Sequence, residues 1–277
     1  SLLVETRAGR KPGGACAASS RIPNGHSWAE DREILMGEVL AHPETLVHLD
    51  FAGGEPFLSP HLPAVLDRLV ESGHASHIRL RFSSNGTVYS DGLAARLRQF
   101  EDAFIGFSVD ATHELHEYLR PPSRFEAVIR NVRAFIETGI RYSIDPTPQA
   151  YNVFGLLDLI RFCDRNGWPF GLGNILSHPR CLSFDVLPEE VLREALAEWE
   201  EYRARECRTE LLAEVDTLLA ALRRPRPCDQ EALQDEFIRF TNDLDRSRGQ
   251  SLARANPRLH QSLCAAGFRF EGKYRFA

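Results

Sequence analysis

Apolar runs of strand length alternate with segments of helical spacing over roughly the first 180 residues. In the helical segments, apolar side chains recur every three or four positions, as at Leu62, Val65 and Leu69, and turn residues such as Gly73 end them. Six strand-length runs occur, at Leu2–Thr6, Leu46–Phe51, His77–Ser83, Ala103–Val109, Arg141–Ile144 and Pro169–Ile175. Strands separated by helices form βαβ units, which require a parallel sheet with right-handed crossovers. The pattern predicts an α/β fold, built either as an open doubly wound sheet or as a partial barrel.

The pattern changes after Pro188, which marks the start of a helix. Residues 189–223 are charged and strongly helical, and a further amphipathic helix is predicted from about Gln230 to Arg246. We therefore predict two domains, a partial barrel over residues 1–180 and a helical C-terminal extension over residues 181–277.

Composition narrows the class of protein. The 277 residues are 43% hydrophobic and 26% charged, which is typical of a globular chain, and the net charge of −6 disfavours broad binding to nucleic acid phosphates. No apolar run approaches the roughly 20 residues of a membrane span, and no charged-then-apolar leader opens the chain. The six cysteines lie far apart without a C-x-x-C pair, which favours free thiols over disulfides or a zinc site. We expect a cytoplasmic protein without nucleic acid or membrane partners.

Polar and glycine-rich residues follow the predicted strands. Because ligands of α/β folds bind at the carboxyl ends of the strands, we expect the binding residues there. The candidates are Gly53, Gly54 and Glu55 after the second strand, Ser84 and Asn85 after the third, Ser108 and Asp110 after the fourth, Gln149 after the fifth and Asn174 after the sixth.

Each candidate also has an ordinary structural interpretation. Glu55 is placed to accept a hydrogen bond from a cationic group, but it also suits a tight turn with a solvated carboxylate. Asp110 near Arg120 fits either a catalytic base beside an orienting cation or a plain ion pair. Gln149 either binds a ligand or caps the next helix. His113 and His116, three positions apart, suit a metal site or a solvated helix start.

The order of these motifs resembles that of radical S-adenosylmethionine (SAM) enzymes. The stretch from Leu49 to Leu58 contains the family's G-G-E-P element, and Ser84-Asn85-Gly86 and Ser108-Val109-Asp110 are similar to its next two motifs. Pro179 to Pro188 and the tail from Phe237 to Leu259 resemble the subgroup with a C-terminal twitch domain.

The resemblance implies a partial (β/α)6 TIM-like barrel that binds SAM. It implies that Glu55 and the nearby backbone hold the SAM ammonium, that Ser108 and Asp110 approach the ribose or the substrate, and that Arg120 faces the SAM carboxylate.

The chain departs from the family at its cluster motif. The family's C-x-x-x-C-x-x-C holds a [4Fe–4S] cluster through three thiolates, whereas this chain has Pro12, Cys16 and Ser19 at that spacing. Proline cannot ligate iron, and a neutral serine hydroxyl does so poorly. Either the cluster is absent, or ligands such as His26, His48 or His178 replace the cysteines, or residues are missing from the chain.

Without the cluster, the leading hypothesis is a SAM-dependent transferase or lyase that uses polar chemistry on a small-molecule substrate. Alkyl transfer, elimination and cyclisation of the methionine moiety are the reactions expected, in specialised metabolism, with Asp110 as general base and Arg120 as carboxylate clamp. Two alternatives remain. One is an inactive paralogue that binds a peptide or partner enzyme through the helical extension, and the other is a radical enzyme with non-standard cluster ligands.

Overall fold

The computed structural model describes residues 2–6, 37 and 40–271. The described chain divides into two compact units. Unit 1 comprises Ser1–Ser108 with Ala127–Ser143, and unit 2 comprises Val109–Glu126 with Ile144–Ala277. This division is a property of packing, and the boundary expected at residue 180 stays a prediction.

Unit 1 contains a five-stranded sheet in the order β1-β2-β3-β4-β5. The strands are β1 (Leu2–Thr6), β2 (Leu46–Phe51), β3 (Arg79–Ser84), β4 (Asp102–Phe107) and β5 (Arg141–Ile144). Strands β2, β3 and β4 pair in parallel, with Leu49 opposite Leu80 and Leu80 opposite Ala103. The α/β class is therefore confirmed.

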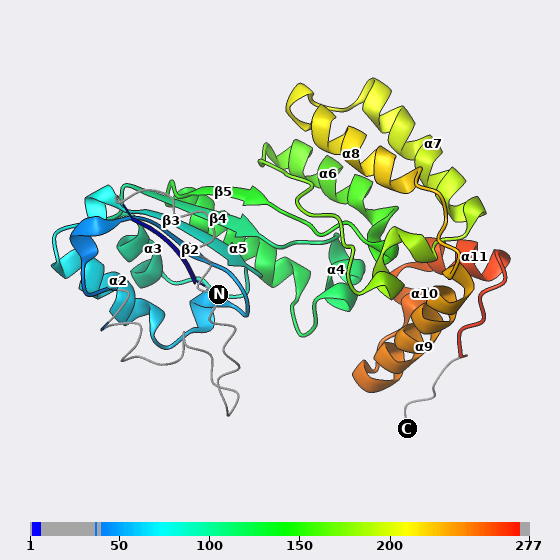
Figure 1. Cartoon of the computed structure of the whole chain (residues 1–277), viewed down its shortest axis with the longest axis horizontal. Helices are drawn as coiled ribbons and strands as arrows, with labels where there is room; N and C mark the ends of the chain where they lie inside the picture. The colour runs from blue at the N-terminus through cyan, green and yellow to red at the C-terminus, as the bar shows by residue number, and fades with distance from the viewer. Residues whose placement is uncertain (1, 7–36, 38–39, 272–277) are drawn as a thin grey trace. The chain divides into compact units, whose positions relative to one another are not determined.

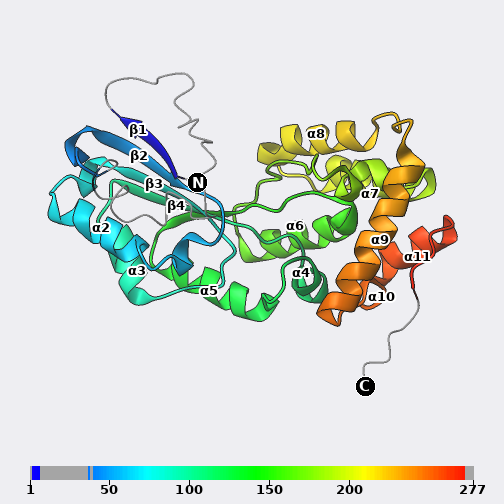
Figure 2. The same ribbon diagram turned by 60° about the horizontal axis from the view of Figure 1, so that its bottom comes forward.

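Three helices cover one face of this sheet, α2 (Leu62–Glu71), α3 (Asp91–Leu97) and α5 (Phe125–Glu137) (Figures 1 and 2). Side chains along β3 alternate between exposed and buried, so that Leu80 and Phe82 enter the core while Arg79 and Arg81 lie on the other face. This alternation sets which face of the sheet carries the core of unit 1.

Two expectations about the strands need correction. Strand β1 pairs antiparallel with β2, with Leu2 opposite Phe51, although a parallel sheet was predicted throughout. The expected sixth strand reduces to a single parallel bridge between Ile144 and Phe170. Beyond this bridge the left-handed conformation of Gly173 ends the extended backbone, and the Leu172 amide donates to the Glu214 carboxylate.

Unit 2 is helical. Its helices are α4 (His113–Leu119), α6 (Gly155–Asn166), α7 (Glu189–Arg205), α8 (Leu212–Leu222), α9 (Gln230–Arg248), α10 (Leu252–Ala255) and α11 (Pro257–Ala265). Its core buries large aromatic side chains, among them Trp199, Tyr202 and Phe237. Helix α9 ends at Gly249, whose left-handed backbone suits a helix C-terminus. Within the described residues, no helix has the length and apolar character needed to cross a bilayer.

Candidate functional site

Two glycines follow β2 and have positive φ angles, 90° at Gly53 and 61° at Gly54. Both are exposed, and a Cβ added to Gly54 would meet no atom of the described residues within 4 Å. Glycine is therefore required at Gly54 by the backbone conformation and not by crowding. The turn leaves open space beside the half-buried Glu55.

The Glu55 carboxylate is held at the carboxyl end of the strands. One oxygen, Oε1, accepts from the Ser84 hydroxyl at 2.9 Å and from the Phe57 amide at 3.2 Å, and Oε2 accepts from the Asn85 amide at 2.6 Å. A carboxylate has about four lone-pair positions, so within the part of the chain that the structure describes, these three donors leave one position able to accept from a ligand. Sequence reasoning placed Glu55, Ser84 and Asn85 at one edge of the sheet but did not predict that they bind one another.

Ser84 organises the turn after β3. Its side chain is almost fully buried, and its hydroxyl also accepts from the Gly86 amide at 3.1 Å. A Cβ at Gly86, where φ is 72°, would lie 2.9 Å from a Val128 methyl, so only glycine fits. The half-buried Ser108 joins the group through its amide, which donates to the Ser84 carbonyl at 2.8 Å. Unit 1 thus gathers the predicted residues from three strand ends into one hydrogen-bonded cluster.

In unit 2, Asp110 is buried and both of its carboxylate oxygens are engaged. Oδ2 accepts from Arg120 Nε at 2.6 Å, and Oδ1 accepts from the Thr147 amide at 2.7 Å. The Asp110 carbonyl accepts from Asn152 Nδ2 at 3.0 Å. Asp110 therefore fixes Arg120, whose side chain remains 28% exposed. The geometry fits the carboxylate-clamp hypothesis for Arg120 better than the general-base hypothesis for Asp110, and both stay predictions.

Gln149 and Asn152 form a reciprocal cap at the short 3-10 helix Ala150–Asn152. The Gln149 amide donates to Asn152 Oδ1 at 2.8 Å, and Asn152 is fully buried. Of the two roles considered for this pair, the structure shows the cap. Asn174, by contrast, is exposed and lines a cavity of unit 2.

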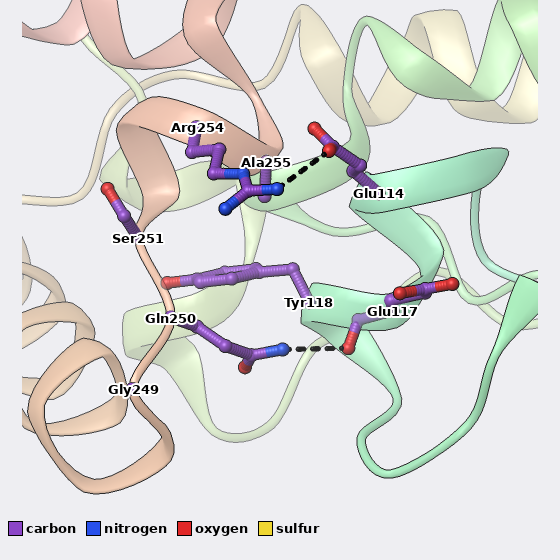
Figure 3. A pocket seen from close by; sticks show the side chains of 8 residues that line it. All are labelled: Glu114, Glu117, Tyr118, Gly249, Gln250, Ser251, Arg254 and Ala255. Carbon is purple, nitrogen blue, oxygen red and sulfur yellow. Dashed lines mark hydrogen bonds and ion pairs between the residues drawn. The ribbon is translucent and has the colours of Figure 1, made fainter.

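The segment of residues 248–254 contacts α4, the helix whose C-terminal cap is Arg120 (Figure 3). Gln250 Nε2 donates to the Glu117 carbonyl at 3.1 Å, and Arg248 Nη1 donates to the Tyr118 carbonyl at 3.3 Å. Arg254 Nη2 lies 3.4 Å from a Glu114 oxygen across a hollow of about 310 Å³. Because these groups pair with each other, we interpret the hollow as part of the packing interface that positions α4.

The two histidines of α4 differ sharply. His113 is exposed and lies 3.5 Å from a Glu126 carboxylate oxygen, whereas His116 is fully buried and its Nε2 lies 3.0 Å from the Ser123 hydroxyl. Burial lowers the pKa of His116 to about 4. A solvated helix start describes His113 but not His116.

No group of three or more His, Cys, Asp or Glu side chains suited to a metal ion occurs among the residues that the structure describes. Pro12, Cys16, Ser19 and His26 lie outside those residues, so the structure does not test the cluster motif. The proposed substitute ligands His48 and His178 lie in different units.

Part of the chain matches a family model. Residues 16–148 match the family model of the Radical SAM superfamily. The Fe-coproporphyrin III synthase of Methanosarcina barkeri (strain Fusaro / DSM 804) is 29% identical over 104 residues, which cover 37% of this chain and 25% of that protein. This chain therefore matches about a quarter of the length of that relative.

Solved structures also match. The native anSMEcpe structure with bound AdoMet is 18% identical, with a TM-score of 0.48 over 64% of this chain and 53% of that one. Streptococcus suis SuiB bound to S-adenosylmethionine is 16% identical, with a TM-score of 0.44 over 64% of this chain and 39% of that one. From the family match, the chain contains a radical SAM superfamily domain, as the resemblance predicted. The twitch-type subgroup and the degenerate cluster motif stay predictions.

Proposed function

We propose that this protein is a SAM-binding enzyme, and that unit 1 recognises the ammonium of the methionine moiety through Glu55. The observation that carries the proposal is the Glu55 carboxylate, fixed by Ser84 and Asn85 with one lone-pair position left and open space beside Gly54. A prepositioned carboxylate binds a cation without the entropic cost of being ordered first. The match of residues 16–148 to the superfamily supports SAM as the ligand.

Arg120 is the residue of unit 2 that we propose as a further ligand. The Arg120 guanidinium is held by Asp110 through Nε, which leaves its two terminal nitrogens to bind a carboxylate. Because Asp110 is itself an acceptor for Thr147, it acts in this proposal as a positioning residue for Arg120.

We further propose that the chemistry is polar and not radical. The side chains at the motif spacing, those of Pro12, Cys16 and Ser19, do not fit a [4Fe–4S] cluster because only one of them supplies a thiolate. Bound SAM supplies an electrophilic sulfonium, and a nucleophile that attacks one of its three carbons displaces a neutral thioether. The protein's part is to hold the ammonium and the carboxylate, which sets the angle of attack.

The test combines metal analysis with binding. The protein is purified anaerobically, iron and sulfide are quantified, and the same sample is titrated calorimetrically with SAM and with 5′-methylthioadenosine, which lacks both the ammonium and the carboxylate of the methionine moiety. We expect no iron, and SAM binding that exceeds methylthioadenosine binding by about tenfold for each of the two proposed charge-assisted contacts, with Glu55 and with Arg120.

Two variants locate the interaction. Glu55→Gln keeps an acceptor for Ser84 but loses the charge, so we expect its preference for SAM to fall about tenfold, while the proposed contact of Arg120 with the carboxylate remains. Glu71→Gln, an exposed change at the end of α2, is the matched control and should retain the preference. Thermal melts confirm that both variants fold. Iron near four atoms per chain would overturn the polar mechanism, and absence of both iron and SAM binding would favour the partner-binding alternative.

A further inference from the structure

A cavity of about 520 Å³ lies within unit 2, between the segment after the Phe170 bridge and one side of α8. Small-molecule sites commonly have volumes of about 300–1,000 Å³. The polar side chains on its wall are Asn174, Ser177, His178, Arg180, Ser183, Asp185, Thr217 and Arg224. None of them belongs to the Gln149–Asn152 cap, to the Asp110–Arg120 pair or to the hydrogen-bonded cluster around Glu55.

The wall of this cavity is fixed by backbone contacts. The Leu172 amide donates to the Glu214 carboxylate, and the Leu176 amide donates to the Pro148 carbonyl at 2.9 Å. Between them, a Cβ at Gly173 would lie 3.1 Å from the Pro146 carbonyl oxygen, so the segment passes close to its neighbour. The cavity is therefore bounded by an ordered segment.

The two arginines on the cavity wall differ in whether a carboxylate neutralises their charge. Arg180 is neutralised by Asp229, with nitrogen–oxygen distances of 2.7 and 3.0 Å, and its Nε lies 3.7 Å from Asp185. Arg224 has no ion pair or side-chain hydrogen bond among the described residues. Its neighbour Arg223, by contrast, is paired with Glu200 at 2.6 Å. Arg224 is thus the unneutralised cation on the wall.

The rest of the wall is apolar. Ile175, Leu176, Phe184 and Ala221 line the cavity beside Arg224. Phe184 is itself buried, so it presents a packed surface against which an aliphatic or aromatic group can rest. A ligand that pairs with Arg224 and packs against the apolar wall has an anionic end and an apolar body.

We propose that this cavity binds a small organic anion, a carboxylate or a phosphate monoester, whose charge is held by Arg224 and whose apolar body packs on Phe184 and Ile175. The role of this ligand as a second substrate of the enzyme rests on the function proposed above. Its binding to the cavity is independent of that function, because every residue of the site belongs to unit 2.

The experiment uses the full chain without SAM and four probes, hexanoate, hexyl phosphate, and the neutral hexanamide and hexanol. Dissociation constants are measured by ligand-observed NMR. We expect hexanoate or hexyl phosphate to bind about tenfold more tightly than its neutral analogue, as one charge-assisted contact predicts. Whichever anion shows the larger ratio identifies the natural head group.

Arg224→Gln should abolish this ratio, and Arg223→Gln should leave it unchanged although it removes the same charge from the same end of α8. Ala221→Phe, which fills the cavity, should weaken charged and neutral probes alike. Equal binding of charged and neutral probes by the unmodified protein would overturn the proposal, as would an unchanged ratio in Arg224→Gln. Glu55→Gln separates the two proposals, because it weakens the SAM preference but should bind hexanoate normally.

Discussion

His116 should make the protein lose stability in mild acid. Its imidazole is fully buried, with Nε2 against the Ser123 hydroxyl and the Phe125 ring centroid 5.7 Å away. Burial is the largest influence and lowers its pKa, the Asp110 carboxylate raises it, and the Arg120 guanidinium lowers it further, with a net value of about 4 against the ordinary 6.5. The folded protein therefore binds the His116 proton less readily than the unfolded chain does.

The sign and size follow from linkage. Because the folded pKa lies below the unfolded pKa, the neutral ring contributes fully above pH 6.5, and the contribution is lost as the pH falls from 6.5 towards 4. The separation between those two values corresponds to about 3 kcal/mol in total. Between pH 7 and pH 5, the free energy of unfolding should fall by about 2 kcal/mol from this histidine alone.

The assay is urea unfolding at pH 7, 6 and 5, followed by circular dichroism. His116→Gln keeps an amide able to bond Ser123 but cannot be protonated in this range, so its pH dependence should be flatter than that of the unmodified protein by about 2 kcal/mol. His113→Gln removes an exposed histidine from the same helix and should behave like the unmodified protein. All other titratable side chains are common to His116→Gln and the unmodified protein, so the difference between these two isolates His116.

One result would refute this reasoning. If His116→Gln and the unmodified protein lost the same free energy of unfolding between pH 7 and pH 5, His116 would not be a buried neutral ring. A His116 ring resonance that titrated near 6.5 in NMR would lead to the same conclusion.

Two further changes test the packing of each unit by urea unfolding. Gly86→Ala should cost about 3 kcal/mol, because it combines a positive φ with a contact of 2.9 Å to Val128. Gly139→Ala, where φ is also positive but the Cβ position is open, should cost only about 1 kcal/mol; equal costs would contradict the role assigned to Val128. Trp199→Phe should cost about 2 kcal/mol, because it removes the bond of 3.1 Å from the indole to the buried Val153 carbonyl, and a loss below 0.5 kcal/mol would show that this carbonyl finds another donor.

Local periodicity predicted most of the secondary structure. The ranges expected for β1, β2 and β5 coincide with those observed, and α9 begins at the expected Gln230. The expected charged helical stretch over 189–223 is divided into α7 and α8 by a break at residues 206–211. The alternation or recurrence of apolar side chains reports burial directly, because the geometry of each strand or helix repeats over a few residues.

Local periodicity did not predict the direction and the partners of the strands. Nothing in Leu2–Thr6 distinguishes an antiparallel edge strand from a parallel one, since both present the same run of apolar residues. The sixth run leaves the extended conformation at Gly173, and the Leu172 amide is bound by Glu214, 42 residues further along the chain. A partner that distant leaves no trace in the local pattern.

For the candidate site, the sequence by itself determined which side-chain types follow the strands, and the family motifs determined the class of protein. Only the tertiary structure decided what those side chains bind. Glu55 binds Ser84 and Asn85 from 29 and 30 residues away, and Asp110 binds Thr147 from 37 residues away. Among the described residues, Arg224 has no ion pair, whereas Arg223 pairs with Glu200. Periodicity describes the environment of one segment, whereas a hydrogen bond or ion pair between distant residues exists only after the chain has closed the loop between them.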